Sequence, residues 1–395
     1  MSLSKTLLGK TFEVSIEKLS LGGNGIARHE GLVLFVPFSA PGDHVLVRVC
    51  EQKNNYVEAE IEKILHASPS RVEAPCPVFG RCGGCNWQHI SSTEQLKQKQ
   101  LIVEEQLKHF LKKEIVVLPI IPSPKDYRYR NRIQLKYQAP ELGFYARKSH
   151  DVVGIDDCPV SEEKIAQKIP VLKAQLQKQK AQEISKIEVF LDEKENVQSV
   201  QEDSPYEGVG FSQVNRFQNK NLLKTVLLWA GDQKYSEIWD LYAGSGNFTF
   251  PLLEKFPSTP VVAAELNEKT VKKAQDLIRL KNMSAKKVRF LLVDVELFLK
   301  RNPVPEQALV VLDPPRLGCS ENTIRYLSQQ RMKRLLYVSC NPSALGRDLQ
   351  RFFALSPHPW KLARIQPFDM FPQTDHVEVL AELILEDHGY SEIDT

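Results

Sequence analysis

The chain has 395 residues, of which 42% are hydrophobic and 26% are charged, and these are values of an ordinary soluble globular protein with two or three domains. The formal net charge of +3 is too small to argue for nucleic acid by itself, so a polyanion site would have to be local. There is no run of roughly 18 apolar residues that could span a membrane, and the first ten residues, MSLSKTLLGK, lack the apolar stretch of a signal peptide, so we expect a cytoplasmic protein without a membrane partner.

The first region, residues 1–66, consists of short apolar runs that are broken by turn residues. Between about Thr11 and Leu65 the runs are FEVSIEKL, LGGNGIAR, GLVLFVPF, PGDHVLVRVC and VEAEIEKIL. Several short strands with regular turns predict a small β barrel. A structural barrel without a ligand fits this pattern equally well. The segment HASPSRVEAP that follows is predicted to be a linker.

The second region, residues 67–204, opens with closely spaced cysteines. Cys76, Cys82 and Cys85 are separated by five and two residues, and Cys158 follows after 72 more. The chain has seven cysteines, an odd number, and no export signal, and three of the cysteines lie within ten residues. This pattern favours metal ligation in a reducing compartment over a disulfide framework. Four thiolates suit either an iron–sulfur cube or zinc, and the residues alone leave that choice open.

Two further stretches of this region carry a recognisable pattern. The first, TEQLKQKQLIVEEQLKHFL, is amphipathic and predicts a helix. The second, DYRYRNRIQLKY, alternates tyrosines and arginines, namely Tyr127, Arg128, Tyr129, Arg130 and Arg132. Bases can stack on tyrosines while arginines hold phosphates, so this stretch is a candidate for binding single-stranded RNA. A solvated strand fits the same alternation.

The third region, residues 205–395, alternates apolar strands with polar periodic segments. The predicted strands are SEIWDLYA, VVAAEL, VRFLLV, ALVVLD and RLLYVS. This alternation predicts a parallel sheet with helices on both faces. The last two apolar stretches, KLARIQPF and HVEVLAELIL, are separated only by DMFPQTD, which is too short for a crossover helix, so they could form a terminal antiparallel pair.

The connection GSGNFTF in this region resembles a cofactor loop. Gly244 and Gly246 permit a tight turn and a close approach of the backbone to a ligand. Glu265 could accept hydrogen bonds from both ribose hydroxyls, and Asp294 and Asp313 end the next two strands. Acidic residues after three successive strands resemble an S-adenosylmethionine site, although any one of them could be a helix cap. A nicotinamide cofactor is the main alternative, and the missing third glycine of its fingerprint weighs against it.

Two cysteines lie beyond strand ends and are candidates for a nucleophile. Cys340 ends its strand directly, where an α/β sheet presents side chains to a ligand, and covalent catalysis beside a cofactor would use such a thiol. Cys319 follows DPPRLG, and spacing alone does not choose between the two; burial as a small apolar residue is the alternative for either. Amino-methylating enzymes carry an aromatic residue where this chain has Arg316, so methylation of an exocyclic amine is not expected.

Four motifs of the third region are DLYAGSGNFTFPL, DPPRLG, LLYVSCNPSALGRDL and FDMFPQTDHVEVL. In this order and spacing they resemble the RNA uracil-C5 methyltransferases, and the likeness covers essentially the whole chain. It implies that the Cys340 thiolate adds to C6 of uridine, which activates C5, and that Glu378 later removes the C5 proton as general base. On pattern alone, Glu378 would be an exposed residue of an alternating strand. The resemblance also implies S-adenosylmethionine contacts from Gln213, Tyr242, Asn247, Glu265, Asp294 and Asp313.

The first two regions extend this resemblance. The cysteine spacing and WQHISSTEQLKQK are similar to the iron–sulfur members of the family, and imply a [4Fe-4S] cluster on Cys76, Cys82, Cys85 and Cys158. The barrel resembles the TRAM domain, an RNA-binding module. The expected fold is therefore multidomain α/β, with a TRAM-like OB-like barrel at 1–66, an α+β iron–sulfur domain at 67–204 and a Rossmann-like methyltransferase domain at 205–395.

This combination is most similar to the enzymes that act on 23S ribosomal RNA, and we expect a monomer that flips the target uridine out of its stack. A tRNA T-loop enzyme is the first alternative. An RNA-binding or chaperone module with a degenerate transferase domain is the second, and the presence of Cys340, Glu378 and Asp313 argues against it.

Overall fold

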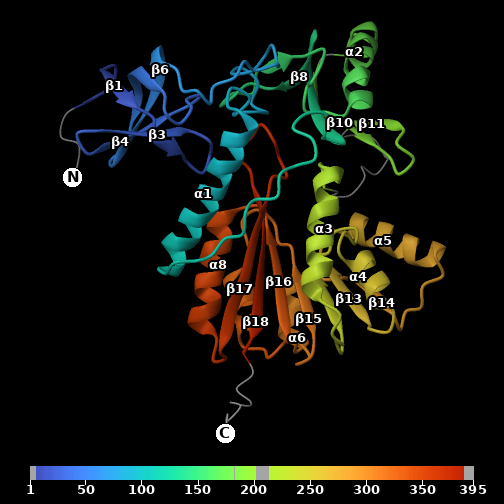
Figure 1. Cartoon of the computed structure of the whole chain (residues 1–395). Helices are drawn as coiled ribbons and strands as arrows, with labels where there is room; N and C mark the ends of the chain where they lie inside the picture. Colours follow the sequence, from blue (N-terminus) through green and yellow to red (C-terminus); the bar gives the residue numbers. More distant parts are fainter. Residues whose placement is uncertain (1–5, 182, 202–212, 387–395) are drawn as a thin grey trace.

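The computed structural model describes residues 6–181, 183–201 and 213–386, which form three sheets of six, five and seven strands (Figure 1). Each sheet falls in one of the three regions of the sequence. Within these described ranges, no helix is long and apolar enough to cross a membrane.

The N-terminal sheet has the strand order β1-β5-β6-β4-β3-β2. Its strands are β1 (Thr11–Ser15), β2 (Lys18–Leu19), β3 (Gly25–His29), β4 (Leu32–Val36), β5 (His44–Gln52) and β6 (Tyr56–His66). Alternate residues of β5, namely Val45, Val47 and Val49, are buried in its core, as expected of a strand with one solvated face. The predicted barrel is a curled sheet, whose end strands β1 and β2 follow one another along the chain without pairing.

The central sheet is antiparallel, with the order β11-β10-β7-β8-β9. Its strands are β7 (Arg132–Gln138), β8 (Glu141–Tyr145), β9 (Val152–Gly154), β10 (Glu183–Leu191) and β11 (Val197–Gln201). Helix α2 (Glu163–Lys178) covers it with Ile165, Ile169, Leu172 and Leu176, which share one helical face. The predicted amphipathic helix is α1 (Ser92–Leu111); it packs along α8 (Pro342–Leu355) of the third region, where Phe110 lies against Gly346.

The C-terminal sheet has the order β14-β13-β12-β15-β16-β18-β17. Its strands are β12 (Ile238–Leu241), β13 (Val261–Glu265), β14 (Val288–Leu292), β15 (Leu309–Leu312), β16 (Arg334–Ser339), β17 (Trp360–Phe368) and β18 (Glu378–Leu385). The first five are parallel, and β17 and β18 form the predicted antiparallel pair. The connecting helices are α3 (Arg216–Ala230), α4 (Thr249–Lys255), α5 (Glu268–Leu280), α6 (Val295–Arg301), α7 (Glu321–Ser328) and α8.

Both faces of this sheet are buried. In β16, Leu335 and Tyr337 belong to one hydrophobic core, while Leu336 and Val338 belong to the core on the other face. Strand β18 lies between β16 and β17 in this sheet, and its first six residues, 378–383, are buried on both faces. Its alternation in the sequence therefore does not mark an exposed side.

Candidate active site and cysteine cavity

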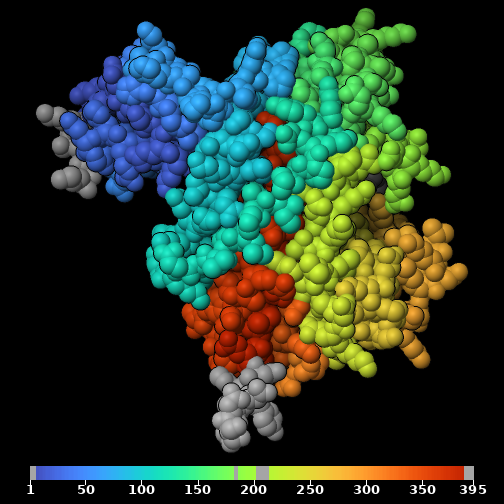
Figure 2. Space-filling view, in the orientation of Figure 1, coloured from blue at the N-terminus to red at the C-terminus, as the bar shows by residue number. Residues whose placement is uncertain are grey.

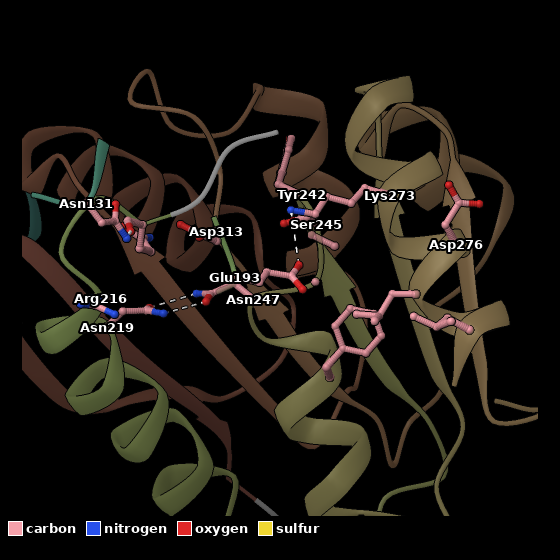
Figure 3. A pocket seen from close by; sticks show the side chains of 17 residues that line it. Asn131, Glu193, Arg216, Asn219, Tyr242, Ser245, Asn247, Lys273, Asp276 and Asp313 are labelled. Atoms are coloured by element: carbon pink, nitrogen blue, oxygen red, sulfur yellow. Dashed lines mark hydrogen bonds and ion pairs between the residues drawn. The ribbon is translucent and has the colours of Figure 1, made fainter. Parts of the chain in front are cut away.

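A cavity of about 660 Å³ lies beside the connection from β12 to α4, against α5 and the turn between β10 and β11 (Figure 3). Its volume falls within the roughly 300–1,000 Å³ of small-molecule sites. Four of the six predicted cofactor residues line it: Gln213, Tyr242, Asn247 and Asp313. They come from the entry to α3 and from the ends of two neighbouring parallel strands, so the sheet topology brings them together.

The β12–α4 connection has the conformation that its glycines were expected to permit. Tyr242, Gly244 and Gly246 all have positive φ angles, of 62°, 55° and 96°. A Cβ on Gly246 would lie 2.5 Å from the ring of Phe250, so a side chain there would collide as well as strain the backbone. The Glu265 carboxylate accepts a hydrogen bond of 2.9 Å from the Gly244 amide, which fixes the turn.

Two predicted cofactor residues do not line the cavity. Glu265 accepts hydrogen bonds from the amides of Gly244 and Asn267, at 2.9 and 2.7 Å. Asp294 is the N-cap of α6 and accepts from the Leu297 amide at 3.0 Å. Asp294 thus has the helix-cap role that the sequence left open, whereas the cap of α5 is Asn267 and Glu265 fixes the turn at Gly244 instead.

The cavity also has lining residues that the sequence did not single out. Glu193, in the β10–β11 turn, and Lys273, on α5, approach to 3.9 Å across the cavity (Figure 3). Asn219 on α3 exchanges hydrogen bonds with Asn247, with the shorter one at 2.8 Å. Glu193, Asn219 and Lys273 belong to no sequence motif. Only the folded structure shows that they line the same cavity.

The two predicted catalytic residues lie at one edge of the C-terminal sheet. Cys340 directly follows β16, and Glu378 begins β18. Because these strands are antiparallel neighbours with Ser339 opposite Val379, the end of one meets the start of the other. The Cys340 residue is half-buried, whereas Glu378 is 2% exposed.

Buried carboxyl groups dominate the electrostatics of this edge. Burial, together with the nearby Glu378 and Asp313 carboxyls, raises the pKa of the Cys340 thiol to about 12, and Arg316 partly opposes this shift. Burial and the negative charge of Asp313 raise the pKa of Glu378 well above its ordinary range. Burial and Asp240 raise the pKa of Asp313 in the same direction. A nearby positive charge would favour the ionised form of each group.

Cys319 has a different environment from Cys340. It is 5% exposed within the hydrophobic core, and its backbone amide donates to Asp348 at 2.8 Å. Its sulfur lies 3.7 Å from the Tyr337 hydroxyl, which in turn donates to Asp348 at 2.7 Å. Cys319 is therefore buried in the core, whereas Cys340 is half-buried.

The four predicted metal ligands share one small cavity of about 70 Å³, which Arg130 also lines. All four are free thiols. Burial raises the pKa of Cys82 to about 11 and that of Cys85 to about 12, and the charge of Cys158 adds to both shifts. Within the described ranges, no three His, Cys, Asp or Glu side chains are placed so that they could hold a metal ion. The four thiols thus share one cavity without forming such a group in the described structure.

The tyrosine–arginine stretch does not present its side chains as predicted. Tyr129 is 1% exposed, and its hydroxyl donates to a backbone carbonyl in the loop before β18. Arg128 forms an ion pair with Asp157 at 2.7 Å, and Arg132 forms one with Glu188. The expectation of base stacking is therefore wrong for Tyr129, whereas Tyr127 is half-buried. The alternative of a solvated strand holds only from Arg132, where β7 begins and its residues alternate between buried and more exposed positions.

Comparisons with known proteins agree with this geometry. A family model described as tRNA (Uracil-5-)-methyltransferase matches residues 180–386, and a TRAM domain model matches residues 5–61. The chain is 46% identical to an uncharacterized RNA methyltransferase of Bdellovibrio bacteriovorus, over 95% of this chain and 96% of that protein. The chain belongs to the RNA uracil-C5 methyltransferase family. It is an S-adenosylmethionine-dependent enzyme with an N-terminal TRAM domain and a Rossmann-like methyltransferase domain, as the sequence predicted.

Two further relatives match nearly the whole chain. A 23S rRNA (uracil(1939)-C(5))-methyltransferase of Hahella chejuensis is 30% identical, over 95% of this chain and 98% of that protein. The crystal structure of the Pyrococcus abyssi tRNA (uracil-54, C5)-methyltransferase superimposes with a TM-score of 0.73, covering 94% of this chain and all of that one at 24% identity. The second likeness establishes a shared fold for nearly the whole chain.

Proposed function

We propose that this enzyme methylates C5 of a uridine in 23S ribosomal RNA, with Cys340 as nucleophile and Glu378 as general base. The observation that carries the assignment of roles is the meeting of β16 and β18, which brings the Cys340 thiol and the Glu378 carboxyl to one edge beside Asp313. Asp313 also lines the cavity of about 660 Å³, so the reacting groups adjoin the space for a cofactor.

The chemistry follows from the low reactivity of uracil C5. The Cys340 thiolate adds to C6, and the electrons of the C5–C6 double bond move toward the C4 carbonyl as an enolate. S-adenosylmethionine supplies the methyl group and a positive sulfonium. Transfer of that methyl group to C5 would break the sulfonium S–CH3 bond and release neutral S-adenosylhomocysteine. The carboxylate of Glu378 then takes the C5 proton, and the electron pair of that C–H bond restores the C5–C6 double bond and expels the Cys340 thiolate. Arg316 assists by favouring the thiolate form of Cys340.

The cofactor would occupy the cavity beside the β12–α4 connection. We assign its contacts to Gln213, Tyr242, Asn247 and Asp313, which line the cavity, and to Glu265 and Asp294, which end β13 and follow β14. The backbone turn at Gly246 supports this assignment, because a side chain there would meet Phe250.

We further propose that Cys76, Cys82, Cys85 and Cys158 hold a [4Fe-4S] cluster. Their sharing of one cavity and the absence of any disulfide among them support this proposal. Four thiols are the ligand set of such a cluster. Iron and acid-labile sulfide content of protein purified without oxygen test this, and stoichiometric zinc would contradict it.

The choice of ribosomal RNA rests on relatives of about 30% identity that span nearly the whole chain. A tRNA substrate is the second candidate, because the matching family model is described as tRNA (Uracil-5-)-methyltransferase. Mapping of 5-methyluridine in both RNA pools, from cells with and without the gene, separates them. Loss of one site in 23S rRNA supports the proposal, loss in tRNA alone supports the second candidate, and unchanged RNA in both pools contradicts both.

A further inference from the structure

The position of Glu378 depends on the loop that precedes it, residues 369–377. This loop joins β17 to β18 and rises from the sheet toward the start of α1 (Figure 1). Its polar side chains are buried: Asp369 is 4% exposed, Gln373 1% and Asp375 6%. Red atoms of the C-terminal part of the chain are visible among the cyan and green atoms of the preceding regions (Figure 2). Something other than solvent must therefore satisfy these polar groups.

Helix α1 supplies two of the partners. The Lys99 ammonium, with a side chain that is fully buried, lies 2.5 Å from the Asp369 carboxylate and 3.0 Å from the Phe371 carbonyl. Gln95 makes a reciprocal pair with Gln373: its amide nitrogen donates to the Gln373 side-chain oxygen, and its oxygen accepts from the Gln373 backbone amide, both at 2.9 Å. These bonds hold both the start and the middle of the loop.

The residue after Cys85 holds the end of the loop. The Asn86 side chain donates to the Asp375 carboxylate at 2.8 Å and accepts from the Asp375 backbone amide at 3.1 Å. The other carboxylate oxygen of Asp375 accepts from the Gly22 amide of the TRAM domain at 3.0 Å. Asp375 is three positions before Glu378, so these bonds fix the segment that enters β18.

The backbone of the loop is itself constrained. Gln373 has a φ of 69°, a left-handed conformation that costs free energy for a residue with a side chain. Such a conformation persists when its surroundings impose it. Here the Gln373 carbonyl accepts from the amides of Asn86 and Trp87, at 3.3 and 3.1 Å, in addition to the pair with Gln95.

We propose that Asn86 and Lys99 are positioning residues for proton removal: they hold residues 369–377 so that the Glu378 carboxyl faces C5 of the bound uridine. This inference rests on the proposed role of Glu378. Cys340 lies on the separate connection from β16 to α8, which none of these bonds touches. His376 of this loop lies 3.4 Å from Arg316, which favours the Cys340 thiolate. Loss of either residue should therefore slow removal of the C5 proton much more than the earlier attack on C6.

Two substrates separate these steps for the full-length enzyme. In an RNA with 5-fluorouridine at the target site, C5 bears fluorine, which a base cannot remove as a proton, so the reaction stops at the methylated covalent adduct. In the uridine RNA, a misplaced base slows turnover and lets the adduct accumulate. For Asn86→Ala and Lys99→Met we expect turnover to fall on the order of 10- to 100-fold, with adduct accumulating. Adduct formation on the 5-fluorouridine RNA should stay within about twofold of the wild type.

Lys97→Met is the matched control, because the Lys97 side chain is 66% exposed on the same helix. It should change neither rate. Lys99→Met leaves the buried Asp369 carboxylate unpaired and could prevent folding, whereas Asn86→Ala is milder because Gly22 still bonds to Asp375. A parallel loss of both rates in folded Asn86→Ala, or no loss in either, would overturn the inference. Glu378→Gln is measured alongside: if it accumulates no adduct, the proposed base fails, whatever the positioning variants do.

Discussion

One half-buried thiol, Cys340, lies at the edge of the C-terminal sheet, and four others share the small cavity; the two places differ in the neighbours of their thiols. Burial raises the pKa of Cys340 and that of Cys85 to about 12. Around Cys340 the next contributors are the Glu378 and Asp313 carboxyls, which Arg316 opposes. Around Cys85 the Gln88 side chain lowers the pKa, the charges of Cys158 and Cys82 raise it, and Arg130 opposes these thiols. A raised thiol pKa therefore does not identify a function. A single thiol beside a buried acid fits covalent catalysis followed by proton removal, whereas several thiols around one cavity fit a metal cluster.

Replacing the single thiol should have the largest effect. Cys340→Ala removes the only atom that can form the adduct in our account, so methylation and adduct formation should both fall to the background level. Cys319→Ala is the matched thiol replacement, and it should retain the adduct because Cys319 is buried in the core. Gel analysis with 5-fluorouridine RNA measures both variants. Retained methylation in Cys340→Ala would show that Cys340 is not the nucleophile.

The acid beside Cys340 should matter nearly as much. Glu378→Gln cannot accept the C5 proton, so turnover should fall on the order of 10²- to 10⁴-fold while the adduct on uridine RNA accumulates. Glu382→Gln is a close control, since Glu382 lies on the same strand and is also 2% exposed. Glu382 pairs with Arg334 and Arg364, so its variant should lower the unfolding temperature without adduct accumulation. The same adduct level in both variants would contradict the assignment.

The thiols around the shared cavity should affect composition and stability more than chemistry. Cys82→Ser should lower bound iron and the unfolding temperature, because a cluster binds the folded state and loses a ligand. The folded fraction should still form the adduct on 5-fluorouridine RNA. Cys50→Ser, an exposed cysteine of β5, should leave the iron content unchanged. Full iron content in Cys82→Ser would show that Cys82 is not a ligand.

The smallest effect is expected on the pH dependence of stability, through Asp240, a buried acid of β12. Burial raises the pKa of Asp240 from its ordinary 3.8 to about 7, so the folded state binds a proton that the unfolded state releases. Its contribution to stability is complete below about pH 4 and is lost as pH rises toward about 7. Asp240→Asn should therefore gain stability relative to the wild type over this range, by on the order of 1–4 kcal/mol. Urea unfolding at several pH values measures this; a difference independent of pH would contradict it.

The sequence predicted the features that depend on residues close together along the chain. The strand–helix alternation gave the C-terminal sheet, and the short DMFPQTD connection gave the β17–β18 pair. The turn at Gly244 and Gly246 was predictable because its backbone conformation favours glycine.

The rest depended on long-range contacts. The alternation of β18 suggested that Glu378 is exposed, and only the completed sheet, covered on both faces, buries it. Glu193 and Lys273 meet at the cavity from separate regions. Tyr129 lies in a stretch whose tyrosines and arginines suggested base stacking, but its hydroxyl donates to a backbone carbonyl in the loop before β18. Asn86 and Lys99 lie far along the chain from the loop that they hold.

The most direct test of the account is to identify the amino acid that carries the RNA. The enzyme is trapped with S-adenosylmethionine on 5-fluorouridine RNA and digested, and the peptide bearing the nucleotide is sequenced by mass spectrometry. The account predicts a single modified residue, Cys340, in the segment LLYVSCNPSALGR. Attachment to Cys319 or to a cysteine of the shared cavity would contradict it.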